Sequence, residues 1–265
     1  MLDLGDVQGL VVRGYTMPVA RHLLLRVDAA GDARTALGSL VDGGNCLPQV
    51  TTGAPWAVKP DCCLNLSITF AGLRALGVRE ESLASFPEEF TAGAANRADR
   101  VGDVGSSAPT HWLPVFRDPG LHLVLSLFGQ SQQAVDRAAD DVLAGVTPGL
   151  SELGRLDAAL LGARADHFGY ADGISQPTID SAPPSGLPDN LPTAPTGEFL
   201  LGHSSQFAQF SYPVPAPEAL GRNGSFAAFR MLAQDVGAFQ QFLAGKIDDA
   251  GLQKALTDGW ATVNR

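Results

Sequence analysis

The chain has 265 residues, of which 45% are hydrophobic and only 17% are charged, so it carries enough apolar material for one large or two ordinary domains. Its 18 basic and 28 acidic side chains give a formal net charge of −10, which repels nucleic-acid phosphates and anionic lipid headgroups. These totals exclude a largely disordered chain and argue against nucleic acid or a membrane surface as a partner.

The first residues do not resemble an export signal. Residues 1–6 lack a basic start, an apolar core and a twin-arginine pair, and no run of 18 apolar residues follows. We therefore expect a soluble, cytoplasmic protein. The three cysteines, Cys46, Cys62 and Cys63, are too few for a disulfide framework and lack C-x-x-C spacing, so we interpret them as buried thiols in a reducing compartment.

Alternating apolar residues predict strands in the first 150 residues. The clearest segments are residues 22–27, 62–70 and 121–128, in each of which apolar side chains share one face. A weaker fourth strand is predicted near residues 46–51, where Pro48 restricts it to a sheet edge or a strand end. Each of these strands would be half-buried.

Helical patterns lie between and after these strands. They cover residues 32–41, residues 71–90 with a break near Gly77, and residues 131–143, where Ser131 suits an N-cap. The order strand, helix, strand, strand, helix, strand predicts a ferredoxin-like α+β domain over residues 1–150, with an antiparallel sheet and helices packed on one face.

Glycine and proline recur from residue 146 to residue 217, which indicates a long connector rich in loops. We place this connector at residues 151–196. Short strands at 197–202 and 225–230, followed by helices at 234–243 and 251–260, then predict the start of a second, truncated ferredoxin-like unit over residues 197–265.

The connector holds the segment that carries chemistry. Asp172 stands between Gly169 and Gly173, and small neighbours of this kind allow the backbone to approach a flat or bulky ligand closely. A plain Asp-Gly turn between two elements would explain the same residues without any ligand.

Five segments together resemble the family of dye-decolorizing peroxidases, in order and in spacing. They are DVQG at residues 6–9, RGY at 13–15, HFGYADGISQP at 167–177, GEFLLG at 197–202 and LGRNGSF at 220–226. The resemblance runs from Asp6 to the last residues and corresponds to the N-terminal portion of that family. It implies two ferredoxin-like units, with haem b held mainly by the second.

The resemblance also implies an activity and a site. Asp172 matches the family's distal acid, which accepts a proton from hydrogen peroxide and returns one to the leaving oxygen while dye-like or phenolic donors are oxidised. Desolvation would raise the pKa of such a carboxyl into the range where it exchanges protons. The residues implied to contact the cofactor are Gly169, Asp172, Gly173, Ile174, Ser175 and Gln176.

The family's proximal histidine and catalytic arginine have no counterpart in this sequence. His203 follows an apparent strand and is interpreted as a loop histidine, and neither Arg222 nor Arg230 matches the arginine by position. We therefore expect the iron ligand to come from outside this segment, from the C-terminal half as a separate chain or from a second copy. A haem-free relative that serves as a binding or structural partner subunit is the alternative.

The other histidines, His22, His111, His122 and His167, show no i, i+4 or H-x-H pairing, so no metal ligands are assigned and a non-haem metal enzyme is the least supported reading. A ferredoxin-like topology would place His22 and His122 at the starts of neighbouring antiparallel strands, at opposite ends of the sheet.

Overall fold

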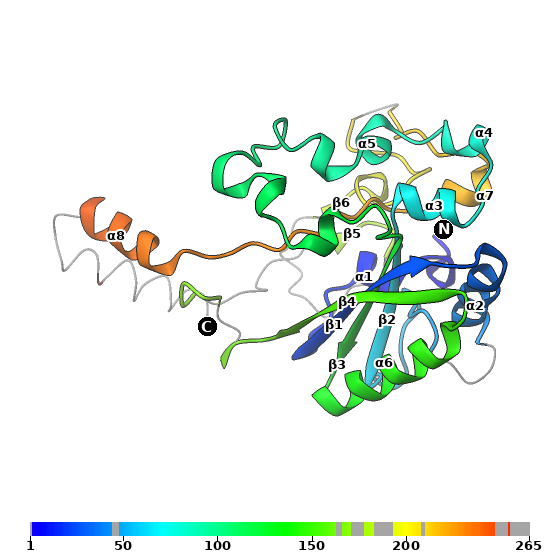
Figure 1. The fold of residues 1–265 in the computed structure, drawn as a ribbon, viewed down its shortest axis with the longest axis horizontal. Helices are drawn as coiled ribbons and strands as arrows, with labels where there is room; N and C mark the ends of the chain where they lie inside the picture. Colours follow the sequence, from blue (N-terminus) through cyan, green and yellow to red (C-terminus); the bar gives the residue numbers. More distant parts are fainter. Residues whose placement is uncertain are drawn as a thin grey trace.

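The computed structural model describes residues 2–43, 48–162, 166–170, 178–182, 193–207, 210–246 and 254 (Figure 1). A four-stranded sheet lies at its centre, made of β1 (Val19–Val27), β2 (Cys62–Ile68), β3 (Leu123–Gly129) and β4 (Leu150–Ala159). The strand order is β2-β3-β1-β4, and every neighbouring pair is antiparallel. This confirms the predicted α+β class with an antiparallel, ferredoxin-like sheet.

Two helices cover one face of this sheet. Helix α2 (Ala30–Asp42) follows β1, and α6 (Gln132–Val146) follows β3; both contribute side chains to the same apolar core. The predicted N-cap of α6 is confirmed, because the Ser131 side chain accepts a hydrogen bond of 3.2 Å from the backbone N–H of Ala134.

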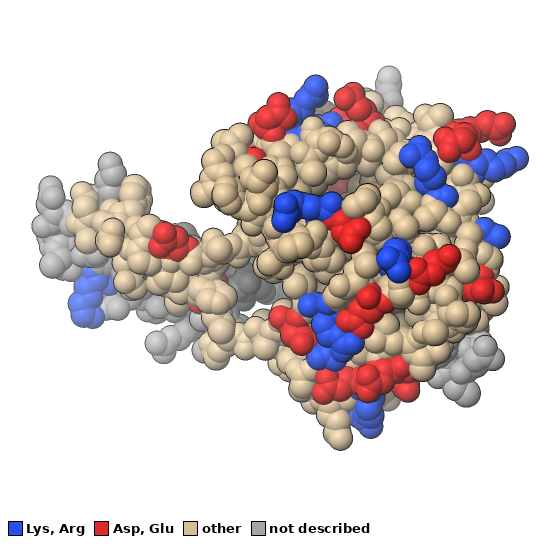
Figure 2. Space-filling model, in the orientation of Figure 1, with Lys and Arg blue, Asp and Glu red and all other residues tan. Residues whose placement is uncertain are grey.

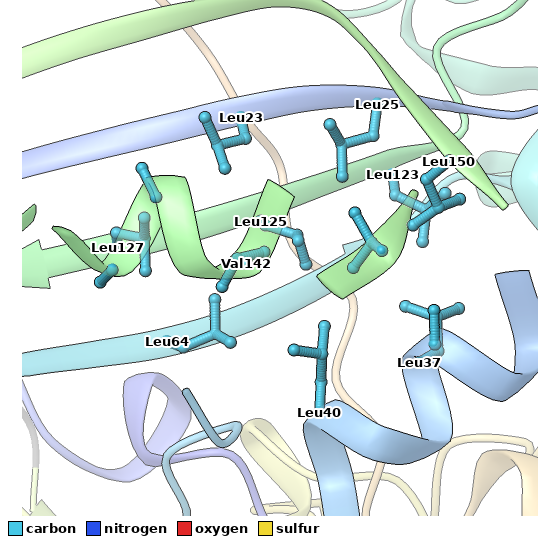
Figure 3. Close-up of a cluster of buried hydrophobic side chains, with 14 of the residues drawn as sticks. Leu23, Leu25, Leu37, Leu40, Leu64, Leu123, Leu125, Leu127, Val142 and Leu150 are labelled. Atoms are coloured by element: carbon cyan, nitrogen blue, oxygen red, sulfur yellow. The ribbon is translucent and has the colours of Figure 1, made fainter. Parts of the chain in front are cut away.

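The core is built from every second strand residue (Figure 3). Because side chains alternate along a strand, the leucines at odd positions of β1 and β3 point together toward the helices. Each fully buried leucine stabilises the fold by about 1.5–3 kcal/mol relative to an exposed one. The residues labelled in Figure 3 are Leu23, Leu25, Leu37, Leu40, Leu64, Leu123, Leu125, Leu127, Val142 and Leu150.

The fourth strand is not the one predicted. Residues 46 and 47 lie outside the described part of the chain, and Val50 forms a single isolated bridge with Leu64. The fourth strand is β4, in residues that the sequence analysis assigned to the connector. The sheet of the first unit therefore extends to Ala159.

The sequence did not predict β4 because the strand contains charged residues and an irregular register. In its pairing with β1, Gly154 lies opposite Leu24 and Glu152 lies opposite Leu25, so Leu153 has no partner residue. Such a β-bulge interrupts the two-residue alternation of apolar side chains along the strand. Charged side chains are frequent on edge strands because they prevent further pairing. Asp157 of β4 also forms an ion pair of 2.5 Å with Arg21.

A long insertion separates β2 from β3. It holds three short helices, α3 (Phe70–Ala75), α4 (Glu80–Leu83) and α5 (Glu88–Asn96), followed by the 3-10 turns Gly105–Ser107, Pro109–His111 and Pro114–Arg117. The predicted break near Gly77 is confirmed: this residue has φ +82°, a conformation that glycine adopts without strain.

The C-terminal region differs from the prediction. Residues 196–198 form a 3-10 helix, and the residues at 197–202 and 225–230 form no strand ladder within the described chain. A strand needs a continuous row of backbone partners, whereas Leu201 exchanges only one pair of backbone hydrogen bonds, with Asn223 and Gly224. The division into domains stays a prediction.

Helix α8 (Val236–Lys246) begins two residues after and ends three residues after the predicted helix at 234–243. Residues 251–260 fall outside the described part except Lys254. Figure 1 places α8 away from the sheet, at the end of an extended segment, and Figure 2 shows few charges on it. Across the described residues, no helix has the length and apolar character required to cross a bilayer.

Candidate functional site

The residues leading to Asp172 form a closed turn. The backbone N–H of Asp166 donates to the carbonyl of Tyr170 at 2.8 Å, and the N–H of Tyr170 donates to the Oδ1 atom of Asp166 at 2.9 Å. Gly169 has φ +92° inside this turn, which explains why glycine occupies the position. The turn ends two residues before Asp172.

The extended segment and α8 hold this turn from outside. The N–H of His167 donates to the side-chain oxygen of Gln234 at 3.0 Å. The ring of Phe239 in α8 lies 4.7 Å from the ring of Phe168 and 6.0 Å, edge on, from that of Tyr170. Residues nearly 70 positions apart therefore meet at the turn.

A second anchor follows the segment. The short strands β5 (Thr178–Ile179) and β6 (Thr193–Ala194) pair in parallel, and Ile179 is buried. Asp180 accepts hydrogen bonds from the backbone N–H and the hydroxyl of Thr196. The chain is thus fixed on both sides of residues 171–177.

Most predicted site residues lie outside the described part of the chain. These are Asp172, Gly173, Ile174, Ser175 and Gln176, so their roles stay predictions. Gly169 is the predicted site residue that the structure describes. Sequence reasoning missed Asp166, Gln234 and Phe239; the spacing of Asp166 before Gly169 was a detectable signal, because Asp side chains commonly close turns on the following backbone.

All five histidines are described. His22, at the centre of β1, has its Nδ1 atom 2.8 Å from the hydroxyl of Ser126, and burial lowers the pKa of its imidazole. His122 lies just before β3 and accepts a hydrogen bond of 2.9 Å from the N–H of Val27, and burial lowers its pKa as well. The predicted antiparallel pairing of β1 and β3 is confirmed, but His22 does not start its strand, because β1 begins at Val19.

The remaining histidines offer no ligand set either. His203 lies 2.7 Å from the side-chain oxygen of Asn223, while His111 and His167 are exposed. Among the described residues, no group of three or more His, Cys, Asp or Glu side chains could hold a metal ion.

The two arginines considered from the sequence are ion-paired. Arg222 pairs with Glu218, four residues earlier, at 2.7 Å. Arg230 pairs with Asp103, whose side chain is buried. Both arginines therefore have structural partners.

The N-terminal motif residues clamp the edge of β2. The side-chain amide of Gln8 donates to the carbonyl of Leu66 at 2.8 Å and accepts from its N–H at 2.7 Å, as a neighbouring strand would. A Cβ at Gly9 would lie 2.4 Å from the Tyr15 hydroxyl, so only glycine fits. The guanidinium of Arg13 lies 4.6 Å above the centre of the Trp56 ring.

Asp6 joins this N-terminal region to the C-terminal one. Its carboxylate accepts a hydrogen bond of 2.6 Å from the side-chain amide of Asn223, which also binds His203. Asn223 has φ +60°, a conformation that asparagine tolerates better than most residues. Two of the motifs that suggested the family, 217 positions apart, are thus in contact.

Of the two described thiols, one agrees with the prediction of buried cysteines and the other only in part. Cys63 is fully buried and Cys62 is half-buried, and both are free. Desolvation raises the pKa of the Cys62 thiol to about 11 and also raises that of Cys63. Neither thiol is suited to act as a nucleophile near neutral pH.

Comparison with known proteins relates this architecture to one family. Residues 50–160 match the model of the DyP dimeric alpha+beta barrel domain, and β4 lies inside that match. The dye-decolorizing peroxidase of Mycena epipterygia is 31% identical over 249 residues, which cover 92% of this chain and 44% of that protein. This chain is related to the dye-decolorizing peroxidases over most of its length.

Solved structures of dye-decolorizing peroxidases share the fold. AauDyP complexed with imidazole superposes with a TM-score of 0.72 at 24% identity, over 92% of this chain and 51% of that one. A dye-decolorizing peroxidase in complex with 2,6-dimethoxyphenol gives a TM-score of 0.66 at 22% identity, over 78% and 46%. The chain spans about half the length of the curated peroxidases that it matches.

The described side chains can be compared with what a peroxidase haem site requires, namely an iron ligand and a proton-transfer group. Three of the five histidines are hydrogen-bonded within the fold and the other two are exposed, and none of them is assigned as an iron ligand. The turn at 166–170 is anchored and leads directly to a carboxylate, the kind of group that transfers protons. A proton-transfer role for that carboxylate, Asp172, stays a proposal, because the residue lies outside the described part of the chain.

Proposed function

We propose that this chain forms the proton-transfer half of a dye-decolorizing haem peroxidase that reduces hydrogen peroxide and oxidises dye or phenolic donors. The observation that carries the proposal is the closed, doubly anchored turn that leads to Asp172 in a chain related to this family. A related structure contains 2,6-dimethoxyphenol, which is a phenolic donor of the proposed class. Haem b, when bound, would supply the iron at which peroxide is reduced.

In this proposal Asp172 performs the acid–base work. Its carboxylate would accept a proton from the proximal oxygen of hydrogen peroxide and return it to the distal oxygen, so that water leaves as the O–O bond breaks. Gly169, Gly173, Ile174, Ser175 and Gln176 are proposed to line the same pocket, where glycine permits close backbone approach.

The iron ligand is proposed to come from outside residues 1–265, from a segment equivalent to the C-terminal half of the family or from a second copy of this chain. Exposed apolar side chains in the C-terminal region favour such a partner, since exposed apolar surface is usually covered. They include Phe207, Phe210, Phe226, Met231, Leu232 and Phe242.

Haem titration followed by kinetics tests the proposal. Purified chain titrated with haemin, alone and with the C-terminal half supplied as a separate polypeptide, should develop a Soret band under at least one condition. Asp172→Asn should then lower the rate of peroxide consumption by roughly 10²- to 10⁴-fold. Asp141→Asn, an exposed carboxyl on α6, is the matched control and should leave the rate unchanged.

The alternative is a haem-free partner subunit. It is favoured because three of the five histidines form hydrogen bonds within the fold. It predicts a colourless protein without iron and an oligomeric mass by light scattering. Failure to bind haem under every condition would decide for it and against the peroxidase. A cytoplasmic location also stays a proposal, which cell fractionation would test.

A further inference from the structure

The extended segment at residues 225–233 has an unpaired backbone. It leads from the C-terminal loops to α8, and every residue in it is exposed (Figure 1). Its N–H and C=O groups form no hydrogen bond with any residue that the structure describes, and the nearest backbone bonds lie at Gly224 and Gln234. An extended stretch with free donors and acceptors is a template on which another strand can pair.

The large side chains of this segment are apolar and face water. Met231 is 58% exposed and Leu232 is 73% exposed, while Phe226 and Phe229 are each exposed by more than 40%. Water can satisfy the free backbone groups, but it cannot favourably solvate these side chains. A row of exposed apolar residues of this kind usually marks an interaction surface.

Contacts with the rest of the protein hold the segment in place. The Phe226 ring lies 5.3 Å from that of Phe90 in α5, and Arg230 is ion-paired with the buried carboxylate of Asp103. A strand that is already fixed loses less conformational entropy on pairing than a loose chain would lose. The segment is therefore preorganised to bind a partner strand.

Charge does not oppose the approach of a second copy at this surface. The whole chain carries a net charge of −10, but Arg230 is the one charged residue between positions 225 and 234 in the sequence. Its charge is neutralised within the same copy by Asp103. Two copies can also place the same segment side by side in opposite directions, since a twofold axis relates identical surfaces.

A register centred on Phe229 pairs all of residues 225–233 in each copy. Leu232 then lies opposite Phe226, and Arg230 lies opposite Ala228 instead of opposite itself. Taking about 200 Å² for a large side chain, the exposed parts of the four apolar residues amount to roughly 400 Å² per copy. The two copies thus offer about 800 Å² of apolar surface, and with the paired backbones this reaches the lower range of specific interfaces.

We propose that residues 225–233 pair antiparallel with the same residues of a second copy, in the register centred on Phe229, and so form a homodimer. The pairing needs no haem and is independent of the peroxidase activity proposed above. Because the surface is small, the dimer should dissociate on dilution.

Sedimentation equilibrium and amide hydrogen exchange on the full chain test the pairing. The mass should rise from that of a monomer to that of a dimer between about 1 and 200 µM. Every second N–H of residues 225–233 would donate across the interface, so this segment should exchange more slowly at the higher concentration. Exchange in the turns at residues 105–111 should be the same at both concentrations.

Paired charges test the register. Ala227 lies opposite Met231 in it, so Ala227→Glu combined with Met231→Glu places like charges opposite each other twice. Ala227→Lys combined with Met231→Glu places opposite charges at the same positions and should dimerise roughly tenfold more tightly than the first variant. Val101→Glu combined with Val104→Glu adds the same charge at exposed positions outside the segment and should leave the dissociation constant of the dimer unchanged.

Three results would overturn the proposal. The first is a monomer at about 200 µM. The second is a dimer in which residues 225–233 are not protected or the two paired-charge variants dissociate equally, because its interface would then lie elsewhere. The third is protection that appears only after a polypeptide equivalent to the second half of the relatives is added, since that polypeptide would then be the partner.

Discussion

Arg230 reaches back across 127 positions of the chain to bind the buried carboxylate of Asp103. This contact ties the extended segment before α8 to the insertion between β2 and β3. The adjacent Phe229 ring packs at 4.9 Å on the ring of His22 and at 5.7 Å on that of Phe116. The extended segment is thus held by charge and by aromatic contacts at neighbouring residues.

Replacing Arg230 by alanine should destabilise the fold. The Asp103 carboxylate would stay buried without a cationic partner, which we expect to lower the free energy of unfolding by about 1–3 kcal/mol in urea denaturation. Arg222→Ala breaks the exposed pair with Glu218 and should cost less than about 0.5 kcal/mol. Equal losses in the two variants would contradict a special role for the buried carboxylate.

Stability should fall as the solution becomes acidic, partly because of His22. Burial lowers its pKa in the folded state below the unfolded value of about 6.5, so the unfolded chain binds more protons between the two values. The free energy of unfolding should therefore decrease as pH falls below about 6.5 and level off once pH passes below the folded-state pKa. His22→Leu should flatten this dependence in urea titrations, whereas His111→Leu, at an exposed site, should preserve it.

The Cys62 thiol should react slowly. With a pKa of about 11 it is almost entirely protonated at pH 8, and the greater nucleophilicity of its thiolate offsets only part of this loss. In a Cys46→Ser background, we expect Cys62 to react with a disulfide reagent roughly 20-fold more slowly than free cysteine. The rate should rise about tenfold per pH unit up to pH 10, and urea should abolish the difference. A fast, pH-independent reaction would disprove the raised pKa.

Two glycine-to-alanine substitutions in helices should have opposite effects. A Cβ at Gly38 in α2 meets no atom within 4 Å, so Gly38→Ala should stabilise the fold by about 1 kcal/mol. A Cβ at Gly72 in α3 would lie 2.1 Å from the His122 carbonyl oxygen, so Gly72→Ala should destabilise it by about 1–3 kcal/mol. Thermal unfolding measures both, and a shift of the same sign would refute the packing argument.

Periodicity was a reliable guide where a single face is buried. The leucines of β3 alternate, and Leu23 and Leu25 of β1 share the same core face although Leu24 between them is also buried. The sheet neighbours predicted from these strands are the ones observed. In β4 the bulge at Leu153 interrupts the period, and charges such as Asp157 are satisfied by partners from elsewhere in the chain. A local sequence pattern shows neither the bulge nor the distant partner of a charged residue.

The site was predictable only as a motif. Glycine at position 169 and the carboxylate at position 172 are visible in the sequence. The positive φ of Gly169 explains why a glycine occupies position 169. The contacts from Gln234 and Phe239 depend on how a segment nearly 70 residues later folds back. Neither residue belongs to any of the five motifs, so sequence reasoning had no basis for choosing them.

The strand order also affects how the protein is made. The central strand β1 pairs with β3 and β4, and the paired residues His22 and Ser126 are 104 positions apart. At a synthesis rate of roughly 5–20 residues per second, β1 waits about 5–20 s on the ribosome before its first neighbour emerges. During that interval its leucines are exposed to other chains, so the yield of folded protein should depend on chaperones that bind the nascent N-terminal segment.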